Sequence, residues 1–209
     1  MNEAKATEIE VKFFLPDLPA LRKRVLQRGG NTRRQRMFER NLRFDTPAAD
    51  LSAAGAVLRL REDNAVTLTY KQRLQDGEHR REIEFAVGDA GQARAFLEAL
   101  GYNVFFIYEK YREVMTLGAC ALMLDDLPFG SFLEIEGPDM AAIERCAAAL
   151  KLNMEHRLRA SYMQTFLALK QQFQFDADYA TFESFQHSKP AQRAAWRSWL
   201  GALESEEPS

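Results

Sequence analysis

Residues 7–15 read TEIEVKFFL, and this stretch alternates charged and apolar side chains. Glu8, Glu10 and Lys12 are each two positions apart, with apolar residues between them. Successive side chains of a β-strand point to opposite faces, so this spacing places the three charges on one face. The stretch is therefore predicted to be a strand with one charged face and one apolar face.

Four other segments also carry like charges two positions apart. On a strand such residues lie roughly 7 Å apart, where two like charges repel by about 2 kcal/mol at an effective dielectric constant of about 20. Several such pairs on one sheet are costly unless groups of opposite charge lie among them. The basic pairs are Arg59/Arg61 and Lys110/Arg112, and the acidic pairs are Glu82/Glu84 and Glu134/Glu136.

Two arrangements of the sheet account for these pairs. In the first, the charged faces point to solvent and the apolar faces form the core, as is common in antiparallel sheets. In the second, the charged faces line the inside of a barrel, and eight strands enclose room for one small ligand. We favour the second, because a polyanion with metal ions would neutralise both signs of charge. The apolar residues then expected to face outward, under amphipathic helices, are Ile9, Val11, Leu58, Leu60, Ile83, Phe85, Leu133 and Ile135.

The rest of the chain is predicted to supply about eight strands in total, with helices between them. Residues 51–62 and 65–71 are interpreted as strands joined by a turn at 62–64, and Asp76-Gly77 marks another hairpin. Further strands are predicted at residues 104–117, 121–124 and 131–136, and helices at 16–30, 89–100, 141–152 and 158–172, with a short helix around Trp196.

The predicted fold class is α+β, with a closed eight-stranded antiparallel β-barrel and amphipathic helices packed outside it. Residues 1–172 are assigned to this domain and residues 173–209 to an aromatic-rich C-terminal extension. The aromatic residues of the extension are too numerous to stay in water, so we expect them to pack against the barrel domain or a partner subunit. The acidic end, ESEEPS, is predicted to be disordered.

Composition narrows the class of protein. An apolar share of 46% and a charged share of 28% are typical of a soluble globular protein. The net charge of -2 differs from the basic excess of many nucleic-acid-binding proteins, so no nucleic-acid partner is expected. The chain has no apolar stretch of transmembrane length and no secretory start, so we expect no membrane partner and a cytoplasmic location.

Residues 8–12 read EIEVK, which matches an ExExK signature, and further motifs follow in order. The set resembles the CYTH superfamily, also called triphosphate tunnel metalloenzymes, over about residues 6–170. This superfamily includes thiamine triphosphatases, inorganic tripolyphosphatases and class IV adenylyl cyclases, and the chain is most similar to the class IV adenylyl cyclase-like or thiamine triphosphatase-like subgroup. The further motifs are LRLRE at 58–62, TYK at 69–71, RREIE at 80–84, EKYR at 109–112, LDDLPFGSFLEIEG at 124–137 and SY at 161–162.

The resemblance implies a role for each charged position. In a regular strand only one of Arg40 and Arg43 can share the charged face, and Arg43 is our candidate. Lys12 is the catalytic candidate, and it either contacts phosphate or orients the attacking nucleophile. The implied ligands of one or two Mg²⁺ or Mn²⁺ ions are Glu8, Glu10, Glu134 and Glu136, with Asp125 and Glu84 as weaker candidates, and the implied phosphate ligands are Lys12, Arg43, Arg59, Arg61, Lys71, Lys110 and Arg112.

The resemblance also implies an activity. The leading hypothesis is a divalent-metal-dependent phosphohydrolase that acts on tripolyphosphate, ATP or thiamine triphosphate bound in the tunnel, and a homodimer is plausible. The first alternative is a class IV adenylyl cyclase that converts ATP to cyclic AMP and pyrophosphate. The second is a non-catalytic module that binds polyphosphate or a nucleotide, which the acidic pairs disfavour because anion binding alone gains nothing from carboxylates.

Overall fold

The computed structural model describes residues 9–73 and 80–202, which form an α+β fold around one antiparallel sheet. The eight strands follow the order β1-β8-β7-β6-β2-β3-β4-β5, which confirms the predicted α+β class and number of strands. Within the described ranges the end strands β1 and β5 do not pair with each other, so closure of the barrel stays a prediction. The strands are β1 (Ile9–Phe14), β2 (Asn31–Asp45), β3 (Ala56–Glu62), β4 (Val66–Arg73), β5 (Arg80–Val87), β6 (Asn103–Leu117), β7 (Cys120–Leu127) and β8 (Gly130–Gly137).

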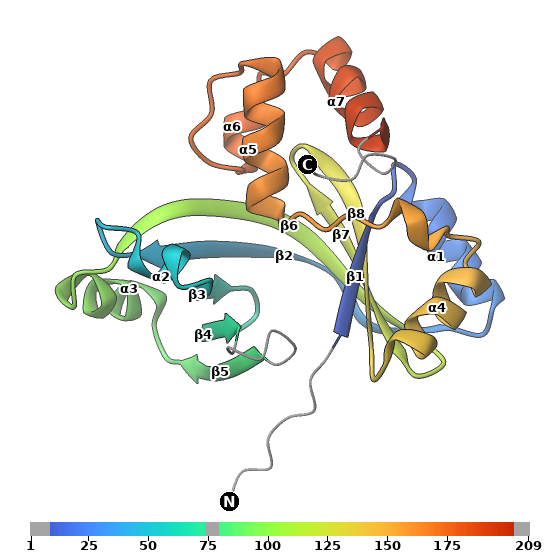
Figure 1. Ribbon diagram of the computed structural model, residues 1–209, viewed down its shortest axis with the longest axis horizontal. Helices are drawn as coiled ribbons and strands as arrows, with labels where there is room; N and C mark the ends of the chain where they lie inside the picture. Colours follow the sequence, from blue (N-terminus) through green and yellow to red (C-terminus); the bar gives the residue numbers. More distant parts are fainter. Residues whose placement is uncertain (1–8, 74–79, 203–209) are drawn as a thin grey trace, which may run out of the picture.

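The sheet is strongly curved (Figure 1). β1, β8 and β7 form one wall and β3, β4 and β5 form the other, while the long strands β2 and β6 connect the two walls. The register between β2 and β6 shifts at several points, including the step from Arg34 to Met37. Such irregularities bend and twist paired strands, which helps to bring the two walls to face each other.

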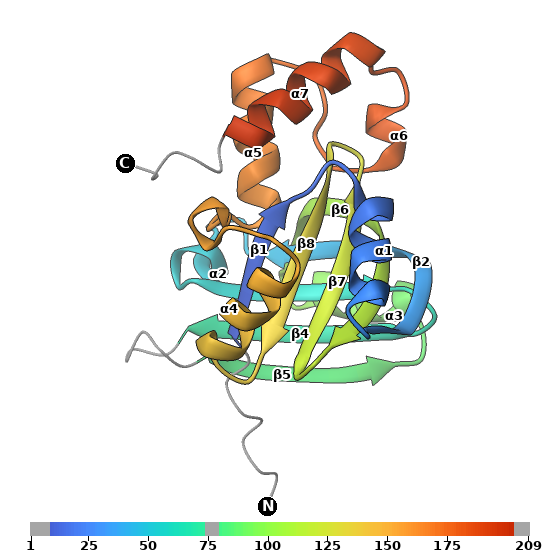
Figure 2. The same cartoon turned by 90° about the vertical axis from the view of Figure 1, so that its right-hand side faces the viewer.

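Helices cover the convex side of both walls. α1 and α4 lie against the first wall (Figure 2), where Val25 and Ile143 pack with Leu122 and Ile135. α3 covers the second wall through Leu97. The helices are α1 (Leu18–Gln27), α2 (Asp50–Ala53), α3 (Ala90–Ala99), α4 (Met140–Ala149), the 3-10 helix η1 (Met154–His156), α5 (Tyr162–Phe173), α6 (Phe182–Phe185) and α7 (Pro190–Ala202).

The last three helices lie together over one end of the sheet (Figure 1). Phe185 and Trp196 pack in one cluster with Phe14, Phe129 and Phe132 of the sheet and its β7–β8 turn. The aromatic residues of the extension therefore pack against the barrel domain, while the division into two domains at residue 172 stays a prediction. The acidic end lies outside the described residues.

α5 begins later than predicted. Residues 158–172 were expected to be helical, but the helix starts at Tyr162 because Ser161 and Gln164 form a capping box at its N-terminus. Leu158 instead lies in an extended segment, where its N–H donates to the carbonyl of Lys12 at 2.7 Å. α4 ends at Ala149 rather than at residue 152, since Lys151 has a positive φ of 58°.

The predicted strand at residues 51–62 is half wrong. Residues 50–53 form α2, and the strand begins only at Ala56. The cause is the Asp45 carboxylate, which accepts hydrogen bonds from the N–H groups of Leu51 and Ser52 at 2.9 Å each. A side chain that satisfies the first N–H groups of a helix stabilises a helical turn there.

The expected helical cover of β5 is also wrong. Ile83 and Phe85 lie on the convex face, as predicted, but their exposed fractions are 44% and 52%. α3 packs through Leu97 in one cluster with Leu58 and Leu60 of β3, and of the described β5 residues only Val87 joins that cluster. The hairpin predicted at Asp76-Gly77 lies outside the described residues.

None of the helices in the described ranges is long and apolar enough to cross a membrane.

Candidate active site

The strand register places the predicted site residues on one face of the sheet. Residues directly opposite each other in neighbouring strands share a face. Lys12 lies opposite Glu134 across β1 and β8, and Arg112 lies opposite Asp125 across β6 and β7. The alternation continues through the other strands, and we call this concave side the inner face. Its charged members include Glu10, Lys12, Arg34, Glu39, Arg43, Arg59, Arg61, Lys71, Glu82, Glu84, Lys110, Arg112, Asp125, Glu134 and Glu136.

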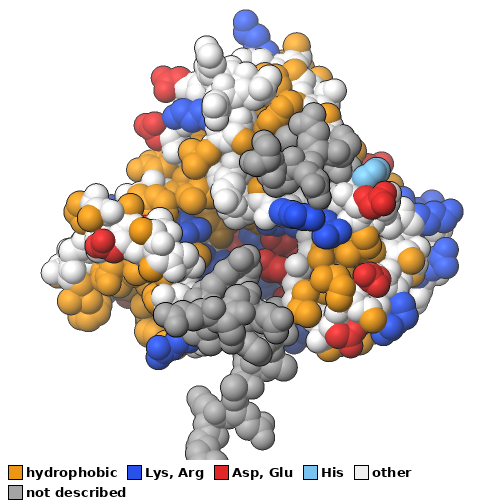
Figure 3. All heavy atoms as spheres, viewed as in Figure 1, with side chains coloured by type: hydrophobic (Ala, Val, Ile, Leu, Met, Phe, Trp, Pro, Cys, Tyr) orange, Lys and Arg blue, Asp and Glu red, His pale blue; other side chains and the backbone are white. Residues whose placement is uncertain are grey.

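The inner face surrounds a hollow in the middle of the molecule, where acidic and basic side chains gather (Figure 3). All predicted site residues in the described ranges belong to this face, and Glu8 lies outside those ranges. Arg43 takes the inward position on β2. Arg40 points outward, where its Nε lies 3.8 Å from the Glu109 carboxylate.

One part of the inner face is a buried set of opposite charges, which we call the paired cluster: Lys12, Glu39, Lys110, Arg112, Asp125 and Glu134. Lys110 is 2% exposed and Asp125 is 0% exposed. Asp125 accepts hydrogen bonds from Lys110 Nζ at 3.0 Å, from Arg112 Nε at 2.6 Å and from the Tyr162 hydroxyl at 2.7 Å. Each charge in this cluster is therefore balanced by another group of the same chain.

Glu134 joins two of the cations in this cluster. Its carboxylate lies 3.2 Å from Lys12 Nζ and accepts a hydrogen bond from Arg112 at 2.5 Å. Burial raises the pKa of Glu134, but Lys12, Arg112 and Lys110 together lower it further, so the pKa lies well below its ordinary value. Glu134 is therefore a carboxylate at any working pH.

The pKa of Glu39 is lowered in the same way. Burial raises its pKa, but the charges of Lys110 and Arg112 and a hydrogen bond from Asn41 lower it more, to about 2. Asn41 Nδ2 donates to Glu39 at 3.0 Å, and Lys110 Nζ lies 3.4 Å from the same carboxylate. Its second oxygen is buried without a hydrogen-bond partner among the described residues.

The arginines of β2 and β3 form a second group, the arginine cluster: Arg43, Arg59 and Arg61. Arg43 lies directly opposite Arg59. The Nε–H of each arginine is buried and has no acceptor in the described part of the chain. The nearest inner-face carboxylate is Glu84, 3.7 Å from Arg59 and 3.5 Å from Arg61. These strands thus present hydrogen-bond donors that the chain itself leaves unused.

Arg43 is the least compensated member of the arginine cluster. No carboxylate in the described residues lies within 4.0 Å of its guanidinium. Burial and, to a smaller extent, the charge of Arg59 lower the pKa of Arg43 below its ordinary value. An anion bound next to it would remove part of this penalty.

Residues 6–165, which are most of the chain, match the sequence pattern of the CYTH domain family. The protein belongs to the CYTH family. Proteins of this family generally depend on divalent metal ions and are known as triphosphate tunnel enzymes. Among curated protein sequences none matches this chain.

Solved structures share the fold of this CYTH protein. A candidate adenylate cyclase from Vibrio parahaemolyticus is 24% identical with a TM-score of 0.65, and the match covers 77% of this chain and 97% of that one. A Pyrococcus horikoshii protein is 25% identical with a TM-score of 0.65, and the match covers 75% of this chain and 98% of that one. An adenylyl cyclase candidate from Hippeastrum, described as having a dominant triphosphatase activity, is 22% identical with a TM-score of 0.57, and the match covers 78% of this chain and 96% of that one.

The carboxylates at one end of the inner face suit the metal that CYTH proteins generally require. Glu10 and Glu136 lie directly opposite each other across β1 and β8. In the described ranges no group of three or more His, Cys, Asp or Glu side chains is placed to hold a metal. Mg²⁺ commonly binds through only one or two carboxylates, together with water and substrate phosphates, so the Glu10 and Glu136 pair fits it.

The two weaker metal candidates, like Glu134, are engaged by other side chains. The Asp125 carboxylate accepts hydrogen bonds from three side chains, and Glu84 accepts one from the Thr69 hydroxyl at 2.8 Å. Their role as metal ligands stays a prediction.

Some inner-face residues were not among the predicted site residues. Glu39 and Asn41 continue the two-residue spacing that leads to Arg43, and that spacing is a signal that could have found them. Tyr162 reaches Asp125 from α5, and its ring centre lies 4.0 Å from Lys12 Nζ. No strand periodicity could reveal Tyr162, because its position depends on how α5 packs.

Proposed function

We propose that this CYTH protein is a divalent-metal-dependent phosphohydrolase that acts on inorganic or organic triphosphates. The observation that carries the proposal is the arginine cluster, in which Arg43, Arg59 and Arg61 each keep a buried Nε–H without a described acceptor. Phosphate oxygens are strong acceptors, and arginine often binds them with two parallel hydrogen bonds. A chain of three phosphates supplies enough oxygens for several arginines at once.

The remaining cations of the inner face fall into two groups. Lys71 lies 3.0 Å from Glu82 and its side chain is 37% exposed, so it is free to turn toward a phosphate. Lys110 and Arg112 are held by Asp125 within the paired cluster. They add positive potential beside the substrate, and their direct contact with phosphate remains part of the proposal.

Glu10 and Glu136 would hold the metal at the β1 and β8 side of the inner face, and Glu134, which here contacts Lys12 and Arg112, would join them on exchanging one of these contacts for the metal. When bound there, Mg²⁺ or Mn²⁺ supplies charge neutralisation at the phosphate oxygens. The low pKa of Glu134 keeps its carboxylate ionised and thus able to serve as a ligand.

Lys12 is the proposed catalytic residue. Its Nζ lies 3.2 Å from Glu134 and 4.0 Å from the centre of the Tyr162 ring, so the ammonium is fixed beside the acidic side of the hollow. From there it would donate a hydrogen bond to a terminal phosphate or orient an attacking water. Phosphoryl transfer depends mainly on such positioning and on charge neutralisation, so no covalent nucleophile is needed.

A product assay separates hydrolysis from cyclisation. The purified protein is incubated with Mg²⁺ or Mn²⁺ and with tripolyphosphate, ATP or thiamine triphosphate, and phosphate, pyrophosphate and cyclic AMP are measured. We expect phosphate release, in keeping with the triphosphatase activity described for the Hippeastrum protein. Cyclic AMP as the main product from ATP would overturn the proposal in favour of a cyclase. Measurable binding without turnover of any triphosphate would overturn it in favour of a binding module.

A pair of variants tests the metal assignment. Glu134→Gln is expected to lower metal-dependent turnover about 100-fold or more while the far-UV circular dichroism spectrum is retained. The control is Glu113→Gln, which removes a similarly buried carboxylate whose partner is Arg22 at 2.9 Å on the convex side of the sheet. Unchanged turnover in Glu134→Gln, or an equal loss in both variants, would show that the assignment is wrong.

A further inference from the structure

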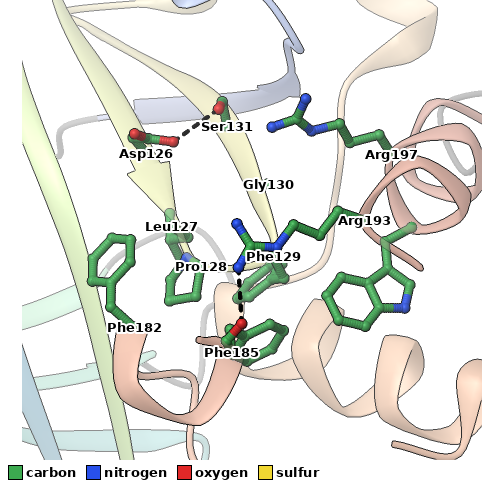
Figure 4. A pocket seen from close by; sticks show the side chains of 11 residues that line it. Asp126, Leu127, Pro128, Phe129, Gly130, Ser131, Phe182, Phe185, Arg193 and Arg197 are labelled. Atoms are coloured by element: carbon green, nitrogen blue, oxygen red, sulfur yellow. Dashed lines mark hydrogen bonds between the residues drawn. The ribbon is translucent and has the colours of Figure 1, made fainter. Parts of the chain in front are cut away.

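A cavity of about 220 Å³ lies between the β7–β8 turn and the helices α6 and α7 (Figure 4). It is separate from the inner face, because neither cluster described above contributes a residue to it. α6 and α7 lie beyond residue 165, where the match to the CYTH domain ends. The side of the cavity that α6 and α7 form therefore belongs to a part of this protein to which the family relationship assigns no role.

The apolar part of the cavity lining is aromatic and firmly packed. Phe129, Phe185 and Trp196 are each 2% exposed. The ring centres of Phe129 and Phe185 are 6.2 Å apart, and those of Phe185 and Trp196 are 5.3 Å apart. These rings contact one another and form the closed floor of the cavity, while the half-buried Phe182 and Pro128 present apolar surface to it.

Two arginines of α7, one helical turn apart, complete the lining. Figure 4 shows Arg193 and Arg197 extending from α7 toward the β7–β8 turn. Arg193 donates a hydrogen bond to the Phe185 carbonyl at 2.9 Å, which fixes its position. In the described part of the chain, no carboxylate lies within ion-pair distance of either guanidinium. Like charges four residues apart on a helix destabilise it, so an anion at this site would stabilise α7.

The one acidic residue in the lining is already balanced. Asp126 pairs with Arg36 at 3.0 Å and accepts a hydrogen bond from the Ser131 hydroxyl at 3.0 Å. The unmatched charge of the cavity is therefore positive.

The volume of the cavity corresponds to about seven water molecules of liquid. This is room for one ring and one acid group.

We propose that this cavity binds a small aromatic anion, an aryl phosphate or an aryl carboxylate. The ring lies against Phe182 and Pro128, and the acid group accepts hydrogen bonds from Arg193 and Arg197. Arginine suits this role because its planar guanidinium donates hydrogen bonds to phosphates and to carboxylates alike. The site is distinct from the proposed triphosphate site, so either can be correct without the other.

Tryptophan fluorescence of the full chain provides the test, because both tryptophans of the protein, Trp196 and Trp199, lie in α7. Phenyl phosphate and benzoate are the probes, and inorganic phosphate and benzyl alcohol supply the charge and the ring separately. We expect a saturable change with phenyl phosphate or benzoate, at a dissociation constant on the order of 1 mM or lower. The probe that binds more tightly shows whether the site prefers a phosphate or a carboxylate. No saturable change with either, or an equal response to inorganic phosphate, overturns the proposal.

Two variants locate the binding. Arg197→Gln is expected to weaken the better probe at least about tenfold, because one charge-assisted contact is lost. Lys189→Gln removes a positive charge that does not line the cavity, and it is expected to leave binding unchanged. The titrations are repeated with saturating tripolyphosphate to fill the inner face. Equal affinity in Arg197→Gln and the unaltered protein, or loss of the response when tripolyphosphate is present, overturns the proposal.

Discussion

The paired cluster and the arginine cluster share the inner face but balance their charges in different ways. Asp125 and Glu134 bring the cations of the paired cluster into contact with carboxylates. In the arginine cluster, Arg43 has no such carboxylate in the described residues. Arg59 and Arg61 share Glu84 at the longer distances given above, and Arg61 also lies 3.9 Å from Asp63. The charges of the paired cluster are balanced within the chain and therefore stabilise the fold, and two of its members, Lys12 and Glu134, are also part of the proposed active site. The arginine cluster keeps buried donors without acceptors in the described residues, and for this reason we propose that it binds the substrate.

The sharpest test of the paired cluster is Asp125→Asn. This change removes a fully buried charge that binds Lys110 and Arg112, and breaking such a buried ion pair is expected to cost about 3–5 kcal/mol. The measurement is the free energy of unfolding in urea. The matched control is its neighbour, Asp126→Asn, whose ion pair with Arg36 is exposed and is worth at most about 1 kcal/mol. Equal costs for the two changes would mean that the paired cluster does not stabilise the fold.

Low pH is expected to lower the stability that the paired cluster provides, by slightly less than Asp125→Asn does. The pKa of Glu39 is lowered from 4.5 to about 2, so its ionised form stabilises the folded state above the higher value. That contribution, about 3 kcal/mol, is lost as the pH falls from about 5 to about 2. Denaturant unfolding at a series of pH values measures it. Glu39→Gln should show a shallower loss than the unaltered protein, and parallel curves would contradict the charge balance described here.

Mutation of the arginine cluster is expected to lower activity and not stability, unlike mutation of the paired cluster. Arg43→Gln should lower kcat/KM for the preferred triphosphate by about 100-fold, or about 2.7 kcal/mol, because one donor to the phosphates is lost. The melting temperature should stay the same or rise, since folding no longer buries a charge beside Arg59. Arg40→Gln, on the outer face of β2, is the control for both measurements. A melting temperature several degrees lower in Arg43→Gln alone would place Arg43 among the structural charges.

Much of the inner face could be predicted because a strand imposes a spacing of two. Glu134 and Glu136 have to point the same way in any strand, and so do Arg59 and Arg61. Which charges meet could not be predicted, because that depends on the order of the strands. Lys12 meets Glu134 only because β1 pairs with β8, its neighbour in space and not in sequence.

The errors lie where contacts between distant residues decide the structure. The strand predicted at residues 51–62 gave way to α2, because Asp45 supplies hydrogen bonds that a local pattern does not show. The cover expected over Phe85 is missing because α3 packs on β3. The position of Tyr162 beside Asp125 depends on the packing of a helix over the end of the sheet.

The way α5 is attached has a practical consequence for anyone who shortens this protein. The boundary of the family match, residue 165, falls inside the first turn of α5. A chain cut there would lose Phe166, Phe185 and Trp196, and Phe14 and Phe132 would be left facing water. Such a fragment would aggregate rather than dissolve, so a minimal version should retain the residues up to the end of α7.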